Sequence, residues 1–305
     1  MDKKKLIDEK RQGKILASVE FFTNKQYNKD KEKGGIPMTM RITDETLMGT
    51  FEQKQELVRS FTMFDDDFFA VVMEDKAAAQ EVLRVLTEIP DLVVKEIKTQ
   101  YSIRNLGTHS VILDALAEDS RHQLYNLELQ VADQDDHQKR VRYYQANVDT
   151  SFLDKGTDYE KLPELYLIYI TKFDLFRLGK AKYIIDRVIS GTNIVVNNGV
   201  HELYVNAAND DGTEIAELME FFTETGTREQ QFPDLSERIA YLKEIKEGVT
   251  HMCEAVRKYG DECRMQERKE MIRNALKMKM QLATIAQLVG LSVEEVQKLI
   301  DEMEH

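Results

Sequence analysis

Two stretches of alternating hydrophobic and polar positions lie near the middle of the chain, joined by a short polar connection. The first covers residues 109–117, the second covers residues 123–131, and residues 118–122 separate them. A period of two is typical of β-strands, and a polar connection of this length favours an antiparallel pair. We therefore predict a β-hairpin over residues 109–131.

The remaining pattern predicts helices and strands on both sides of this hairpin. Helical spacing covers residues 43–90, where Pro90 ends the run, and returns over 136–153 and from 213 to the end of the chain. Residues 92–101 alternate as a strand does, and residues 165–170 form a short apolar run typical of a buried strand. Residues 203–205 are a weaker strand candidate.

The two sides of the hairpin differ in character, because strand side chains alternate between faces. One side is apolar in both strands and is predicted to be buried: Val111, Leu113, Ala115, Ala117, Tyr125, Leu127, Leu129 and Val131. The other side carries Asp114, Asn126, Glu128 and Gln130 among aliphatic residues. An unpaired carboxylate in such surroundings is costly, and a divalent cation would offset that cost.

Asp114 and Glu128 suit Mg²⁺, with Mn²⁺ as the alternative ion. Mg²⁺ takes oxygen ligands, keeps several waters and leaves positions for a phosphate oxygen. Such an ion lowers the pKa of a bound water and neutralises charge that builds on the phosphorus. Gln130 projects from the same face, where it would orient that water. The spacing alone leaves a plainer alternative open, in which the strand acids pair with a basic residue.

Charge and composition change this picture only in part. The chain of 305 residues carries a net charge of −13, although residues 1–35 hold ten Lys and Arg against six Asp and Glu. An acidic total disfavours phosphate binding, but local basic patches and metal ions can make the contacts. Apolar runs fall short of the roughly 18–20 residues of a membrane span. We therefore expect a cytoplasmic protein without a membrane partner.

The chain resembles the Rpn-type recombination-promoting nucleases, also described as PD-(D/E)XK nuclease family transposases. The resemblance runs from about Phe64 to the C-terminus and is specific because its stretches occur in the family's order. They are FDDDFF at 64–69 with its helix to PDL at 90–92, TQY at 99–101, SVILD at 110–114, YNLELQ at 125–130, KRVRY at 139–143, LPELY at 162–166 and LYVN at 203–206.

This resemblance implies a restriction-endonuclease-like fold and Mg²⁺-dependent cleavage of DNA. The fold is a mixed β-sheet flanked by helices, here with an all-α C-terminal extension. Asp114 falls on the first aspartate of the family motif, and Glu128 on the acid of its Glu-x-Lys element. Gln130 replaces the usual lysine, which removes a permanent positive charge. Asp66 is the candidate outer metal ligand, with a helix N-terminal charge as the alternative.

The stretch after the hairpin supplies the candidate DNA contacts Lys139, Arg140 and Arg142; the alternative is an ordinary solvated helix face. The function expected is that of a metal-dependent DNA endonuclease linked to recombination or mobile elements. The alternative is a catalytically weak or inactive nuclease-fold protein that serves as a DNA- or protein-binding regulatory module, which the acidic charge and Gln130 both favour.

Three regions are predicted: a basic arm at 1–40, a nuclease-like core at 41–210 and a helical region at 211–305. Residues 283–303 resemble a helix-turn-helix, with Gly290 in the turn and a capping box formed by Ser292 and Glu295. The second helix is acidic, whereas a helix that reads the major groove needs basic or amide side chains. We therefore favour protein contact over DNA reading, with these C-terminal helices as a candidate surface for homo-oligomer formation.

Overall fold

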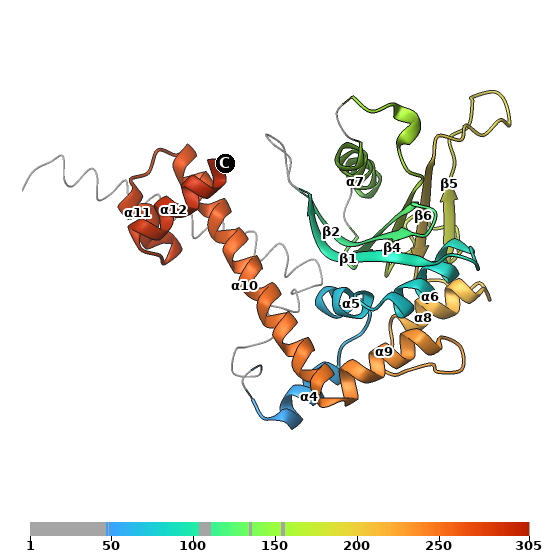
Figure 1. The fold of residues 1–305 in the computed structure, drawn as a ribbon, viewed down its shortest axis with the longest axis horizontal. Helices are drawn as coiled ribbons and strands as arrows, with labels where there is room; N and C mark the ends of the chain where they lie inside the picture. Colours follow the sequence, from blue (N-terminus) through green and yellow to red (C-terminus); the bar gives the residue numbers. More distant parts are fainter. Residues whose placement is uncertain (1–46, 48, 104–110, 134–135, 154–155, 305) are drawn as a thin grey trace, which may run out of the picture.

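A six-stranded mixed β-sheet forms the centre of the computed structural model, which describes residues 47, 49–103, 111–133, 136–153 and 156–304 (Figure 1). The strand order is β1-β2-β3-β4-β6-β5. The strands β1, β2 and β3 are antiparallel, β3, β4 and β6 are parallel, and β5 is antiparallel to β6. The strands are β1 Val94–Ile103, β2 Val111–Asp119, β3 Leu124–Gln130, β4 Leu165–Thr171, β5 Lys182–Ile185 and β6 Val200–Asn206.

Helices cover both faces of this sheet, with α7 on one face and α5, α6, α8 and α9 toward the other (Figure 1). The mixed sheet flanked by helices confirms the predicted fold class. The helices are α4 Phe51–Arg59, α5 Asp66–Met73, α6 Lys76–Thr87, α7 His137–Phe152, the 3₁₀ turn η1 Tyr159–Lys161, α8 Glu214–Phe221, α9 Pro233–Glu244, α10 Lys246–Lys277, α11 Leu282–Val289 and α12 Val293–Glu304.

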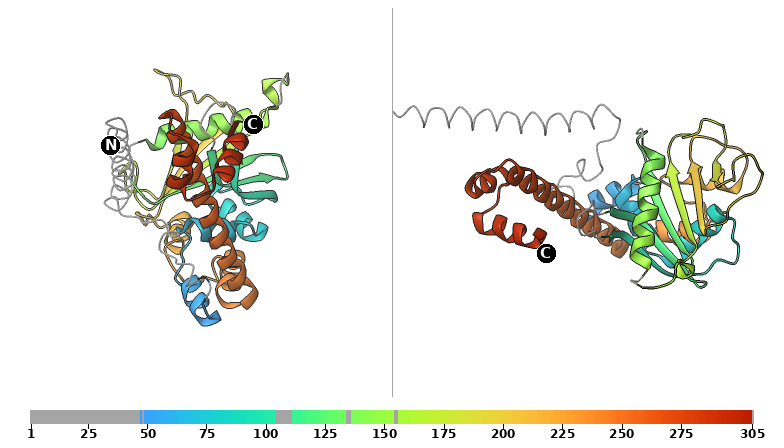
Figure 2. Two further views of the ribbon diagram at one scale, coloured as in Figure 1. Left: turned by 90° about the vertical axis from the view of Figure 1, so that its left-hand side faces the viewer. Right: turned by 90° about the horizontal axis from the view of Figure 1, so that it is seen from above.

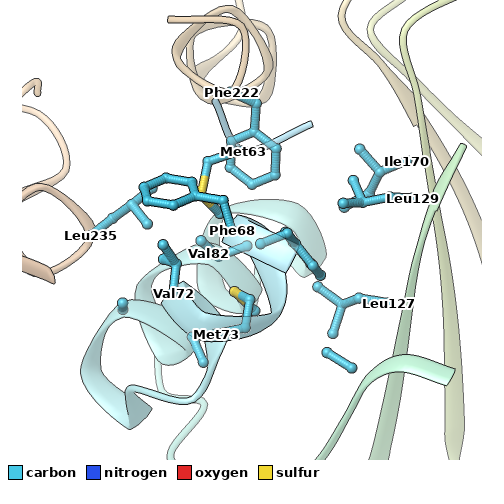
Figure 3. Packing of buried hydrophobic residues seen from close by; sticks show 14 of the residues in the cluster. Met63, Phe68, Val72, Met73, Val82, Leu127, Leu129, Ile170, Phe222 and Leu235 are labelled. Carbon is cyan, nitrogen blue, oxygen red and sulfur yellow. The ribbon is translucent and has the colours of Figure 1, made fainter. Parts of the chain in front are cut away.

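The larger hydrophobic core lies between the sheet and the helices opposite α7. Leu127, Leu129 and Ile170 reach from the strands toward Phe68 of α5, with Phe222 close by (Figure 3). Residues of α8, α9 and α10 belong to the same cluster. The predicted helical region beyond residue 211 therefore contributes directly to the core under the sheet.

A smaller core fills the space between the sheet and α7. Val141 and Val148 of α7 pack against Leu116, Leu124 and residues of β4 and β6. The spacing of seven residues between the two valines puts both on one side of the helix, as the helical pattern over 136–153 predicts. This layer brings the first turns of α7 over the end of β3.

In β1 and β2, the face of the sheet on which the apolar side chains lie changes at the level of Asp114. Leu113 packs in the smaller core with α7, whereas Ala115 packs in the larger core. Beside them, the pairs Thr99–Ala115 and Tyr101–Leu113 place Gln100 at the level of Asp114, and Gln100 has a left-handed φ of 48°. The prediction of one uninterrupted apolar side was therefore wrong, because a left-handed residue redirects the strand locally.

All five predicted strands are present, with limited errors at their ends. Val131 was predicted to be buried but is 40% exposed, because β3 ends at Gln130. The edge strand β5 was not predicted, and it has only four residues. The basic arm at 1–40 and the start of the hairpin at residues 109 and 110 lie outside the described residues.

The three C-terminal helices pack around a core of their own. Helix α10 runs away from the sheet and carries α11 and α12 at its far end (Figures 1 and 2). Gly290 ends α11 in the left-handed conformation with φ 67°, and Ser292 and Glu295 form the predicted reciprocal cap. The helix-turn-helix outline is confirmed. None of the helices in the described ranges has both the length and the apolar character needed to cross a membrane.

Candidate functional site

Asp114 and Glu128 meet across the central hairpin. The paired register of β2 and β3 ends at Ala115–Leu127, so Asp114 is the first residue of β2 beyond it. Asp114 lies close enough to Glu128 for its charge to raise the pKa of Glu128. The Asp114 carboxylate turns toward β3, where its Oδ2 accepts a hydrogen bond of 2.8 Å from the Leu129 N–H. The hairpin thus brings together the two acids that the sequence singled out.

Burial makes this pair electrostatically costly. Glu128 is 5% exposed, and its Oε1 has no hydrogen-bond partner among the described residues. Burial raises the pKa of Glu128 well above its usual value, and the nearby charge of Asp114 raises it further. Burial likewise raises the pKa of Asp114, although the Leu129 N–H and the positive charge of Arg140 oppose this. The two carboxylates together favour either a retained proton or a bound cation.

Two neutral side chains border Glu128. Asn126 is 1% exposed, and neither polar atom of its amide has a hydrogen-bond partner within the described part of the chain. Its amide and the Tyr144 hydroxyl from α7 still counteract the rise in the pKa of Glu128. The sequence placed Asn126 on the acidic side of the hairpin but assigned it no role. Tyr144 was missed, because only the packing of α7 brings its hydroxyl to this strand.

Gln130 is held at both ends of its amide. Its Oε1 accepts a hydrogen bond of 2.7 Å from Arg140 Nη1, and its Nε2 donates one of 2.9 Å to the Ala132 carbonyl oxygen. The Tyr169 hydroxyl lies 3.5 Å from the same Oε1. The amide therefore has a defined orientation, with its oxygen directed at the guanidinium of Arg140.

A chain of polar contacts continues from Tyr169 to the start of α7. The Tyr169 hydroxyl is 2.9 Å from His137 Nδ1, and His137 Nε2 is 3.3 Å from Asp133 Oδ1. Both Tyr169 and His137 are buried. The sequence offered no sign of this network, since its members are spread over β4, α7 and the loop between β3 and α7. It fixes the surroundings of Gln130 from the side of β4.

The three consecutive aspartates at the start of α5 have different surroundings. Asp66 is exposed at the start of α5, and its charge raises the pKa of Asp114, as expected of a carboxylate near the pair. Asp67 is buried, its Oδ2 has no partner within the described ranges, and burial raises its pKa to about 7. Asp65 instead caps the preceding turn by accepting from the Thr62 N–H and hydroxyl.

The predicted DNA contacts occupy different environments on α7. Lys139 and Arg142 are exposed, whereas Arg140 is partly buried beside Gln130. Loss of solvent and the neighbouring charge of Asp65 raise the pKa of Asp66. Lys172, at the end of β4, lies over the Phe64 ring, and its positive charge opposes that rise. Of these basic side chains, Arg140 acts on the acidic pair, because its charge opposes the rise in the pKa of Asp114.

The residues present fit a divalent cation bound through few protein ligands. Among the described residues, no three His, Cys, Asp or Glu side chains gather as a ready-made metal cluster. The unpartnered Oε1 of Glu128 beside Asp114 nevertheless supplies the hard oxygen ligands that Mg²⁺ or Mn²⁺ prefers. Mg²⁺ in particular is commonly held by one or two carboxylates, with waters and substrate phosphates completing its shell.

The family model described as PD-(D/E)XK nuclease family transposase matches residues 74–279, about two thirds of the chain. The matched range contains Asp114, Glu128, Gln130 and Arg140, and it begins after Asp66. No curated protein and no solved structure matches this chain.

Proposed function

This chain belongs to the PD-(D/E)XK nuclease family of transposases, and on that basis we propose that it is a metal-dependent DNA endonuclease. Its substrate is the phosphodiester bond of DNA, and its proposed ion is Mg²⁺, with Mn²⁺ as the alternative. A role in recombination or in the movement of genetic elements accords with the family.

The observation that carries this proposal is the buried, unpartnered Oε1 of Glu128, whose carboxylate lies close to that of Asp114. A structural acid in a protein core normally has hydrogen bonds or a basic partner, because an unpaired buried charge costs several kcal/mol. Buried carboxylates with strongly raised pKa values are typical of functional sites. A site that binds a cation and a phosphate accounts for both carboxylates.

Each residue then has a defined task. Asp114 and Glu128 hold the cation, and Asp66 at the rim is an outer ligand. A divalent cation bound there would activate water and offset the negative charge of the phosphate. Lys139 and Arg142 contact the DNA backbone outside the site and contribute to affinity through phosphate charge. The Tyr144 hydroxyl orients the Glu128 carboxylate from α7.

The direct test is the nicking of supercoiled plasmid DNA under Mg²⁺ by the parent, Asp114→Ala and Glu128→Ala. We expect a loss of cleavage of on the order of a hundredfold or more in both variants, with their folds checked by circular dichroism. Lys161→Ala, an exposed change on η1, serves as the control and should cleave as the parent does. Equal rates for the parent and both acid variants would reject the endonuclease proposal.

A second candidate is a nuclease-fold protein that binds DNA or protein without cleaving it. Two observations favour it: the net charge of −13, and the absence of a lysine at position 130. Under this alternative, the parent binds a DNA duplex in a mobility-shift assay but does not nick plasmid with Mg²⁺ or Mn²⁺. Cleavage that depends on Asp114 would exclude it.

A further inference from the structure

Arg140 of α7 supplies a positive charge beside Gln130, which stands on β3 in place of the lysine of the family motif. Arg140 lies in the first turn of that helix and donates from Nη1 to Gln130 Oε1 at 2.7 Å. Gln130 and Glu128 are two residues apart on β3, so both project from one face of the strand. Contact with Gln130 therefore puts the guanidinium next to the carboxylate pair, and its charge counteracts the rise in the pKa of Asp114.

Hydrogen bonds fix the orientation of the Gln130 amide in this contact. Nε2 of Gln130 donates to the Ala132 carbonyl oxygen at 2.9 Å, so the amide oxygen is directed at α7. The buried Tyr169 hydroxyl, itself 2.9 Å from His137, approaches the same oxygen. A flipped amide would bring its NH₂ group against the Arg140 N–H, donor against donor. The network thus presents an acceptor to Arg140 and limits how the guanidinium can turn.

We propose that Arg140 is a catalytic residue that contacts a non-bridging oxygen of the scissile phosphate, and that Gln130 is the positioning residue that holds it there. This inference rests on the proposed endonuclease function and assigns Gln130 a task other than orienting water. A guanidinium has five N–H donors in a planar array suited to phosphate oxygens, and Gln130 accepts from one of them.

The charge change in hydrolysis explains why a cation is needed. A water oxygen bonds to phosphorus while the bond from phosphorus to one sugar oxygen breaks with its electron pair. The water releases a proton to solvent, and the leaving oxygen takes one up. Negative charge on the phosphoryl group and the leaving oxygen rises during this step, and a prepositioned cation stabilises it.

A double-mutant cycle tests the division of roles. We expect Arg140→Ala to lower kcat on the order of a hundredfold, with Arg140→Lys recovering part of the loss. Gln130→Ala should lower kcat less, and the double variant should be no slower than Arg140→Ala alone, because Gln130 acts through Arg140. Losses that multiply would overturn the positioning role. Lys139→Ala is the comparison on the same helix, and it should raise KM while kcat is retained.

A binding measurement without divalent ions tests the phosphate contact independently of cleavage. The affinity for a DNA duplex is measured by fluorescence anisotropy in EDTA over a series of salt concentrations. Arg140→Ala should reduce the slope of log Kd against log salt by about one, the value expected for one lost phosphate contact. An unchanged slope would overturn the proposal. If Asp114→Ala cleaves as fast as the parent, the endonuclease function fails, while the salt slope still decides whether Arg140 contacts phosphate.

Discussion

Replacing Glu128 with glutamine should stabilise the metal-free protein at pH 8. The carboxylate is buried, its Oε1 has no partner among the described residues, and it lies beside Asp114. A buried group left without a partner costs about 1–3 kcal/mol, and a charged one costs more. Glutamine keeps the shape and removes the charge. We expect a gain of about 1–3 kcal/mol, or roughly 2–5 °C in Tm for a protein of this size.

The gain should depend on pH in a defined direction. Burial raises the folded-state pKa of Glu128 above its usual 4.5, so the folded protein retains a proton that the unfolded chain releases as the pH rises. The ionised Glu128 therefore lowers the stability of the parent by its full amount above the raised pKa, and it has no such effect below a pH of about 4, where the carboxyl is protonated in both the folded and the unfolded chain. Thermal unfolding in EDTA at pH 8 and pH 4 measures the difference. Glu160→Gln, at an exposed site on η1, is the control. A Glu128→Gln variant less stable than the parent at pH 8 would refute this reasoning.

Three other substitutions test separate parts of the structure. Asp67→Asn should raise stability by up to about 4 kcal/mol at pH 8 and little at pH 4, since burial raises the pKa of Asp67 from 3.8 to about 7; urea unfolding at both pH values measures this. Lys243→Met should cost about 1–3 kcal/mol in urea unfolding, because the buried ammonium donates to three backbone carbonyls that would lose a donor. Gly290→Ala should lower the free energy of unfolding by about 1 kcal/mol, because alanine is strained at a φ of 67°. The cost stays small because an added Cβ meets no atom within 4 Å, and faster amide hydrogen exchange confined to α10–α12 would confirm it.

Alternation along two strands was sufficient to predict the hairpin and the facing acids. The polar positions 114 and 128 share a side in the register that puts the apolar positions of both strands on one face, so their meeting follows from the alternation together with the need to bury the apolar side. The change of faces at Asp114 does not follow from it. That change coincides with the left-handed φ of Gln100, and glutamine is not a residue type that marks such a conformation.

The surroundings of the acidic pair depended on contacts that span the fold. Charge alone identified Arg140 as a candidate DNA contact, but its bond to Gln130 depends on how α7 crosses β3. The same holds for Tyr169, which approaches Gln130 because β4 lies parallel to β3, and for His137 of α7, which contacts Tyr169. Lys243 is a further case, since nothing in the sequence distinguishes a buried lysine on α9 from the exposed ones.

The central claim is that Asp114 and Glu128 form a binding site for a divalent cation, and calorimetric titration tests it most directly. Mn²⁺ and Mg²⁺ are titrated into the metal-free parent, Asp114→Asn and Glu128→Gln at pH 8, with Glu160→Gln as the matched control. We predict one saturable site in the parent and in the control, and its loss in both variants of the pair. Binding that survives in Asp114→Asn and Glu128→Gln, or no saturable binding in the parent, would contradict the claim.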